Sequence, residues 1–63
     1  MEIEIKKEHI EISMICEEGG FIIRCFENGQ IDLYEVPLYG GDERFNCKCQ
    51  TINEAIRVGR SWT

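Results

Sequence analysis

Four cysteines are the residues of this sequence best suited to metal or redox chemistry. Four thiolates can hold a tetrahedral zinc ion, but the ligands of a structural zinc site usually stand about two to four residues apart on turns. Here eight, twenty-one and one residues separate the successive cysteines, which are Cys16, Cys25, Cys47 and Cys49. This spacing favours free thiols, buried as small hydrophobic side chains, over a zinc site or a disulfide. It predicts no metal and no cofactor.

Catalysis by acid, base or nucleophile has few candidates, because His9 is the only histidine. A general base must lie within hydrogen-bonding reach of the group that it activates. His9 stands in an acidic segment beside a change of strand pattern, so we expect it to be exposed and without a catalytic role. The glycine pairs at residues 19–20 and 40–41 lead into no helix and therefore indicate turns rather than phosphate-binding loops. The sequence predicts a non-enzymatic protein with no catalytic residues.

The net charge of −5 is concentrated in residues 1–20, whose six glutamates are Glu2, Glu4, Glu8, Glu11, Glu17 and Glu18. These side chains could imitate a phosphate backbone, although a solvated strand face with a turn is the simpler interpretation. Phosphates dominate the affinity of nucleic acids for proteins, so the acidic charge disfavours nucleic acid as a partner. The charge suits a protein partner with a basic surface, or it serves solubility alone.

Residues 1–63 are predicted to form one domain, because a chain this short buries only about 60% of its unfolded surface and has room for one core. Its start lacks the basic residues and the apolar segment of a signal peptide. No apolar run approaches the ~20 residues that a membrane-spanning helix needs. We therefore expect a cytoplasmic protein with reduced thiols and no membrane contact.

The clearest structural signal is Asn28-Gly29 between two apolar runs. Both residues tolerate positive φ, so the pair predicts a two-residue type I′ turn between strands over residues 21–27 and 30–38. Alternating residues predict another strand over residues 1–16, with a bulge or break at residues 7–9 where the alternation changes phase. Turns at residues 17–20 and 40–41 then leave a last strand over residues 43–50.

A helix over residues 52–61 is predicted to follow the last strand. Thr51 and Glu54 fit a capping box, in which each side chain satisfies a free backbone amide at the helix start. Apolar positions recur at helical spacing, at Ile52, Ala55, Ile56, Gly59 and Trp62. The predicted fold class is α+β, with an antiparallel β-meander of three to four strands and one C-terminal helix packed on one face. The placement of residues 1–9 stays open.

Two-residue turns would fix the register of each strand pair and so assign every side chain to a face. The expected closing pairs are Glu27 with Gln30, Tyr39 with Asp42, and Glu17 with Gly20. The core face under the helix then holds Ile12, Met14, Cys16, Phe21, Ile23, Cys25, Asp32, Tyr34, Val36, Leu38, Phe45, Cys47 and Cys49. Asp32 is the acidic exception on this face, and Cys25 and Cys49 flank it. This cluster is where a redox or metal role would be placed.

The opposite, outer face of the predicted sheet carries an apolar patch. Large exposed apolar patches usually mark interaction sites. The predicted partner-binding residues are Ile22, Arg24, Phe26, Ile31, Leu33 and Glu35. Two alternatives stay open: residues 1–9 could cover the patch with Ile3 and Ile5, or a homodimer could bury it.

Basic residues also fall on the predicted outer face, beside Phe26, at Arg24, Arg44 and Lys48. A three-stranded sheet backed by a C-terminal helix, with basic and aromatic residues on its open face, resembles the DNA-binding domains of plant AP2 factors and integrase arm-binding domains. The resemblance covers residues 21–62. It implies DNA contact through Arg24, Arg44 and Lys48.

A second resemblance rests on the whole chain, which is short and acidic, lacks catalytic residues, and has a strand running into residues 47–56 and a terminal Ser61-Trp62-Thr63. It resembles the small proteins encoded by phages and other mobile elements. The resemblance implies a protein that binds and blocks a host protein, as anti-CRISPR and other anti-defence inhibitors do. The leading hypothesis is a non-enzymatic binding module that docks on a host or cellular protein through its outer face. A sheet-mediated DNA-binding domain and a structural or regulatory homodimer are the alternatives.

Overall fold

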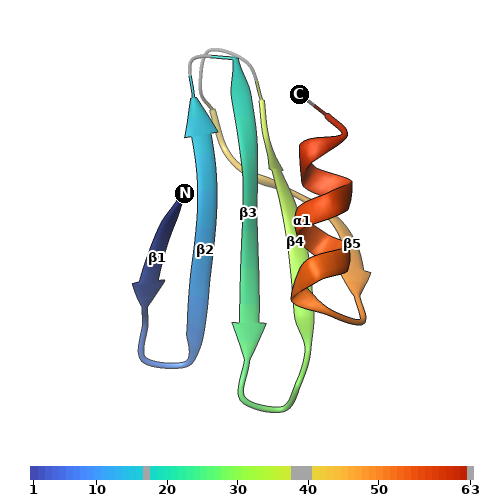
Figure 1. Cartoon of the computed structure of the whole chain (residues 1–63). Coiled ribbons are helices and arrows are strands. Elements are labelled where there is room, and N and C mark those ends of the chain that lie inside the picture. Colours follow the sequence, from blue (N-terminus) through green and yellow to red (C-terminus); the bar gives the residue numbers. More distant parts are fainter. Residues whose placement is uncertain (17, 38–40, 63) are drawn as a thin grey trace.

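The computed structural model describes residues 1–16, 18–37 and 41–62, which form one antiparallel sheet and one helix (Figure 1). The elements are β1 (Glu2–Ile5), β2 (His9–Cys16), β3 (Gly19–Phe26), β4 (Ile31–Val36), β5 (Arg44–Cys49) and α1 (Ile52–Arg60). The strands lie in the sheet in the order β1-β2-β3-β4-β5. The predicted α+β class and the C-terminal helix are confirmed. The sheet has five strands rather than three to four, because residues 1–16 form two.

The N-terminal residues pair with β2 along the edge of the sheet and do not cross its outer face. The Lys6 amide donates a hydrogen bond to the His9 carbonyl at 2.9 Å, which closes a tight turn at the predicted break. Ile3 lies opposite Ile12 and Ile5 lies opposite Ile10. The change of phase in the sequence therefore places isoleucines of both strands on one face.

The pairing of β2 with β3 differs from the expected register by two residues. Cys16 lies opposite Gly19, whereas the expected turn would have placed it opposite Phe21. The expected partner Glu17 lies outside the described residues. Because side chains alternate with a period of two, this shift leaves each side chain of β2 and β3 on the face predicted for it.

The hairpin between β3 and β4 was predicted at the right place but with the wrong loop length. Phe26 donates a backbone hydrogen bond to the Gln30 carbonyl at 2.9 Å, and Gly29 donates one to Phe26 at 3.0 Å. Gly29 has φ 91°, the left-handed conformation that ends a typical three-residue loop. The amide of Gln30 also donates to the Asn28 side chain at 2.9 Å. The loop therefore has three residues, and the register of β4 shifts by one.

A shift of one residue exchanges the two faces of β4. Ile23 lies opposite Leu33 and Cys25 lies opposite Ile31, so both β4 residues face the helix. Leu33 is fully buried. Six predicted placements are thereby wrong, among them Asp32 and Tyr34, which lie on the outer face, and Ile31 and Leu33, which lie on the helix side. Glu35 and Val36 exchange faces with them, because they belong to the same strand.

A bulge between β4 and β5 changes the pairing register by one residue partway along β5. Leu33 lies opposite Cys47 but Tyr34 lies opposite Phe45, which leaves Asn46 as an extra residue. Phe45 consequently shares the outer face with Tyr34 and is not a core residue, contrary to the prediction. Cys47 and Cys49 remain on the helix side. The predicted pairing of Tyr39 with Asp42 and the core position of Leu38 involve residues outside the described ones.

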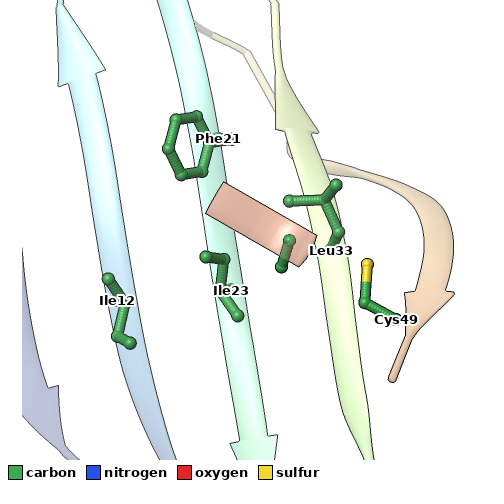
Figure 2. Packing of buried hydrophobic residues seen from close by; sticks show 6 residues of the cluster. Ile12, Phe21, Ile23, Leu33 and Cys49 are labelled. Carbon is green, nitrogen blue, oxygen red and sulfur yellow. The ribbon is translucent and has the colours of Figure 1, made fainter. Parts of the chain in front are cut away.

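The helix begins with the two predicted capping side chains, although Glu54 bonds to the amide of Gln50 and not to that of Thr51, its usual partner in a capping box. Glu54 donates its amide to the Thr51 hydroxyl at 3.0 Å, and its carboxylate accepts from the Gln50 amide at 3.2 Å. α1 packs on β3, β4 and β5, so β1 and β2 extend beyond it (Figure 1). The core between helix and sheet consists of Ile12, Phe21, Ile23, Leu33, Cys49 and Ala55 (Figure 2). As predicted, the helix covers the core face of the sheet.

Candidate functional site

The outer face is the side of the sheet away from α1, because Ala55 of α1 is buried with Ile23 and Leu33, which lie on the other side. Strand pairing places charged and aromatic residues next to one another at its centre. They come from four neighbouring strands and are His9, Glu11, Arg24, Phe26, Asp32, Tyr34, Phe45 and Lys48. We refer to Arg24, Phe26, Tyr34 and Phe45 as the aromatic cluster.

Arg24 lies at the middle of the aromatic cluster and is held there by three neighbours. Its Nε donates to Glu11 Oε2 at 3.3 Å, and its Nη2 donates to Glu43 Oε1. The guanidinium carbon lies 4.4 Å from the centre of the Tyr34 ring, which is a cation–π distance. The side chain is 23% exposed. Arg24 is therefore held in one orientation by contacts within the chain.

His9 belongs to the same network, and the expectation that it is exposed was wrong, since its side chain is 20% exposed. Its Nε2 lies 3.0 Å from Glu11 Oε2, and its ring centre lies 5.3 Å from that of Phe26. The hydrogen bond from His9, followed by that from Arg24, lowers the pKa of Glu11 below its usual value. Glu11 is consequently ionised at neutral pH and accepts hydrogen bonds from both His9 and Arg24.

Tyr34 and Phe45 form the other half of the aromatic cluster. Their ring centres lie 5.7 Å apart with an interplanar angle of 76°, an edge-to-face contact. Phe45 is 53% exposed, which is unusual for a phenylalanine on an ordinary strand face. The bulge at Asn46 brings this ring to the outer face. Sequence reasoning missed Tyr34 because the hairpin register was predicted one residue out, and it missed Phe45 because nothing in the residue pattern of β5 marks the bulge.

The six predicted partner-binding residues do not share a face. Ile22, Arg24 and Phe26 lie on the outer face, but Ile22 is only 6% exposed. Ile31, Leu33 and Glu35 lie on the helix side, because of the shifted hairpin register. The contiguous exposed apolar patch expected on the outer face is therefore absent from the described residues, and the aromatic cluster lies in its place.

The three predicted DNA-contacting residues are also separated. Arg44 lies opposite Glu35 on the helix side, while Lys48 lies opposite Asp32 on the outer face. Arg24 is engaged by Glu11 and Glu43. The structure therefore does not bring Arg24, Arg44 and Lys48 together as a basic surface.

The four cysteines are free thiols in different surroundings. Cys49 is buried and Cys25 and Cys47 are half-buried, as expected, whereas Cys16 is exposed. Burial, together with the Cys47 thiol 3.9 Å away, raises the pKa of Cys49 to about 11. Asp32 lies on the outer face, so the expected cluster of Asp32 with Cys25 and Cys49 does not form. No group of three or more metal-binding side chains occurs among residues 1–16, 18–37 and 41–62.

An acidic strip adjoins the aromatic cluster on the outer face of β1 and β2. It consists of Glu2, Glu4 and Glu11, which surround an open hollow of about 300 Å³ together with Ile3 and Ser13. Lys6 forms an ion pair with Glu4 at 2.6 Å. Glu4 pairs with Lys6 and Glu11 pairs with Arg24, so the three carboxylates of the strip leave a small excess of negative charge on this half of the outer face.

Exposed isoleucines collect on the helix side of β1 and β2, where α1 does not reach. Ile3, Ile5 and Ile10 are 69%, 81% and 43% exposed. They lie side by side in the register, and we call them the isoleucine shelf. The shelf continues the buried core outward to the free edge of the sheet.

The fold and these surfaces define a small α+β protein with one helix on a five-stranded antiparallel meander. No protein-family model matches the chain, and no curated protein or solved structure matches it either. Within the described part of the chain, no helix has the length and apolar character needed to cross a membrane.

Proposed function

We propose that this protein is a non-enzymatic binding module that docks on a basic protein surface through the outer face of its sheet. The observation that carries the proposal is the fixed position of Arg24 over Tyr34, on a face that the helix leaves open. The docking surface comprises the aromatic cluster and the acidic strip. This proposal keeps the outer face as the docking side but replaces Ile31, Leu33 and Glu35 with Tyr34 and Phe45.

The composition of the aromatic cluster supports a protein partner. Aromatic residues and arginine are enriched at protein interfaces and dominate their binding energy. Phe45 is the most exposed member, and Tyr34 holds it in edge-to-face contact. Binding costs free energy when side chains must be ordered, and Arg24 and Tyr34 are already ordered by their mutual contact.

The charge of the docking surface supports a basic partner. Glu2, Glu4 and Glu11 lie on one side of the aromatic cluster, and Glu43 lies against Arg24. Carboxylates arranged in this way accelerate the approach of a positively charged surface and fix its orientation. The exposed face of Phe45 can in turn accept a lysine or arginine of the partner by a cation–π contact.

The proposed partner is a cytoplasmic protein that handles nucleic acid, since proteins of that kind carry basic surfaces for phosphates. A small acidic protein seated on such a surface would exclude the nucleic acid and so act as an inhibitor. This is the mode of action implied by the resemblance to small inhibitors of phages and mobile elements.

The proposal is tested by affinity capture with three tagged baits: the native chain, a Phe45→Ser variant and an Ile52→Ser variant. Ile52 is 40% exposed at the start of α1 and provides the matched control for removal of an exposed apolar side chain. We expect a protein that the native and Ile52→Ser baits retain and the Phe45→Ser bait loses. With that protein purified, the dissociation constant should rise steeply with added salt. Equal retention by all three baits would contradict the proposed surface.

A further inference from the structure

The free edge of β1, like the outer face of the sheet, is left without a neighbouring element in the described residues. β1 is the first strand of the sheet, and within the described residues no strand lies on its other side. An edge strand presents unpaired backbone amide and carbonyl groups that can pair with another strand. The β1 edge of this protein is not protected by proline.

The positions of the unpaired groups on β1 follow from its pairing with β2. Lys6 and His9 form a hydrogen-bonded pair at the turn. Hydrogen-bonded and non-hydrogen-bonded pairs alternate along an antiparallel ladder, so the backbone groups of Glu4 and Glu2 also point toward β2. The backbone groups of Ile3 and Ile5 therefore point away from the sheet, toward the free edge.

The side chains of this edge strand are complementary to those of a second copy of the same strand in antiparallel orientation. On the outer face, Glu2, Glu4 and Lys6 follow one another, and Lys6 contacts Glu4. On the helix side, Ile3 and Ile5 alternate with them. A strand with acids at one end and a base at the other matches a second copy of itself running in the opposite direction.

We propose that two copies of this chain pair through β1 in antiparallel orientation, with Ile3 opposite Ile5 of the partner subunit. The two isoleucines exchange their free backbone hydrogen bonds, and the pair occurs twice by symmetry. Glu2 then faces Lys6 of the partner subunit at both ends. Glu4 meets its own copy at the centre, where each Glu4 keeps its ion pair with Lys6.

Charge selects this register over its neighbours. A shift of two residues in one direction places Glu2 opposite Glu4 of the partner subunit, and like charges directly opposite are destabilising. A shift in the other direction pairs Glu4 with Lys6 of the partner subunit, but it places Ile3 opposite the partner's Lys7 and Glu2 opposite the partner's Glu8. The proposed register is the one that pairs both isoleucines of β1 with isoleucine, keeps Glu2 opposite the partner's Lys6, and confines like charge to the single central pair of Glu4 residues.

The same register joins the apolar faces of the two copies. In each copy, Ile3 continues a row through Ile12, Ile23 and Leu33 to Cys47. Ile5 continues the parallel row through Ile10, Cys25 and Ile31 to Cys49. Pairing Ile3 with the partner's Ile5 connects the first row of one copy to the second row of the other. The isoleucine shelf, exposed in one chain, becomes the continuous middle of a ten-stranded sheet.

Sedimentation equilibrium of the native chain tests the proposal, which does not depend on the outer-face docking surface. We expect a mass that rises with concentration toward twice the 7.4 kDa of one chain. A mass of one chain up to millimolar concentration would overturn the proposal.

A charge-swap series tests the register. Glu2→Lys alone and Lys6→Glu alone should each raise the dimer dissociation constant about tenfold, since two pairs of like charge are created by symmetry. The double variant Glu2→Lys with Lys6→Glu restores opposite charges and should return the dissociation constant to within about threefold of native. A double variant no tighter than the single variants would overturn the register.

Ile3→Pro compared with Ile3→Ala tests the backbone pairing. Both variants remove the same side chain, but proline also removes the amide that points to the free edge. We expect Ile3→Pro to dimerise at least tenfold more weakly than Ile3→Ala, while the thermal melts of the two monomers agree. Equal dimerisation of the two variants would overturn pairing through the β1 edge.

Discussion

Gly59 of α1 lies directly over the ring of Phe21 in β3. A methyl group at Gly59 would lie 2.5 Å from the nearest ring carbon. The glycine therefore sets how closely the helix approaches the sheet, and Phe21 fills the space beneath it with no exposed surface.

Gly59→Ala should accordingly destabilise the protein by about 1–3 kcal/mol, the usual cost of overpacking a core. In an exposed helix position the same change is favourable by about 1 kcal/mol, because alanine has the higher helix propensity. Urea unfolding measures the difference, with Asn53→Ala as a control on the exposed side of α1. A raised midpoint for Gly59→Ala would show that the helix does not rest on Phe21.

Leu33 and Phe45 provide a test of the strand register. Leu33 is fully buried, so Leu33→Ala should lower the free energy of unfolding by about 2–5 kcal/mol. Phe45 is half exposed, so Phe45→Ala should cost about 1 kcal/mol or less. A two-residue turn at Asn28-Gly29 would bury Phe45 and expose Leu33. The reverse order of the two effects in urea unfolding would therefore contradict the three-residue loop.

From the lowered pKa of Glu11 we predict that the stability of the protein depends on pH. Its pKa is lower in the folded protein than in the unfolded chain, because His9 and then Arg24 donate to it. Its stabilisation is therefore fully present above the unfolded pKa, near 4.5, and is lost as pH falls through the lower folded pKa. Glu11→Gln should cost about 1 kcal/mol at pH 7.

Urea unfolding of the native chain and of Glu11→Gln between pH 7 and pH 3 measures this contribution. The difference between the two proteins should be constant down to about pH 5 and should then shrink. Glu8→Gln, at an exposed position before β2, is the control and should show little difference at any pH. A difference that grows toward acid pH would contradict the sign of the shift.

The thiols should differ in their reactivity toward iodoacetamide. The thiolate is the reactive form, and burial together with the Cys47 thiol raises the pKa of Cys49 to about 11. Cys16 is exposed, so at pH 8 it should be alkylated first while Cys49 stays protected in the folded protein. Peptide mass spectrometry over time measures the two rates, and unfolding in urea should make them similar. Rapid alkylation of Cys49 at pH 8 without denaturant would show that its thiol is accessible in the folded protein.

The sequence alone determined the elements of this fold and their order, except that residues 1–16 form two strands and not one. Alternating residues gave the strands, and Thr51 with Glu54 gave the helix start, because capping and periodicity depend only on residues near one another in the chain. Asn28-Gly29 located the central hairpin for the same reason. From these local signals the α+β class and the side of the sheet that the helix covers could be predicted.

The tertiary structure decided which side chains of β4 and β5 lie on each face. A glycine with positive φ ends a two-residue or a three-residue loop, so the residues at the turn are compatible with either register. Packing distinguishes the two registers: Leu33 is buried and Ile31 half-buried on the side that α1 covers, and the bulge keeps Cys47 and Cys49 on the same side. The aromatic cluster follows from this register. Tyr34 and Phe45 lie on the outer face because their neighbours in the sequence pack in the core against residues distant in the chain.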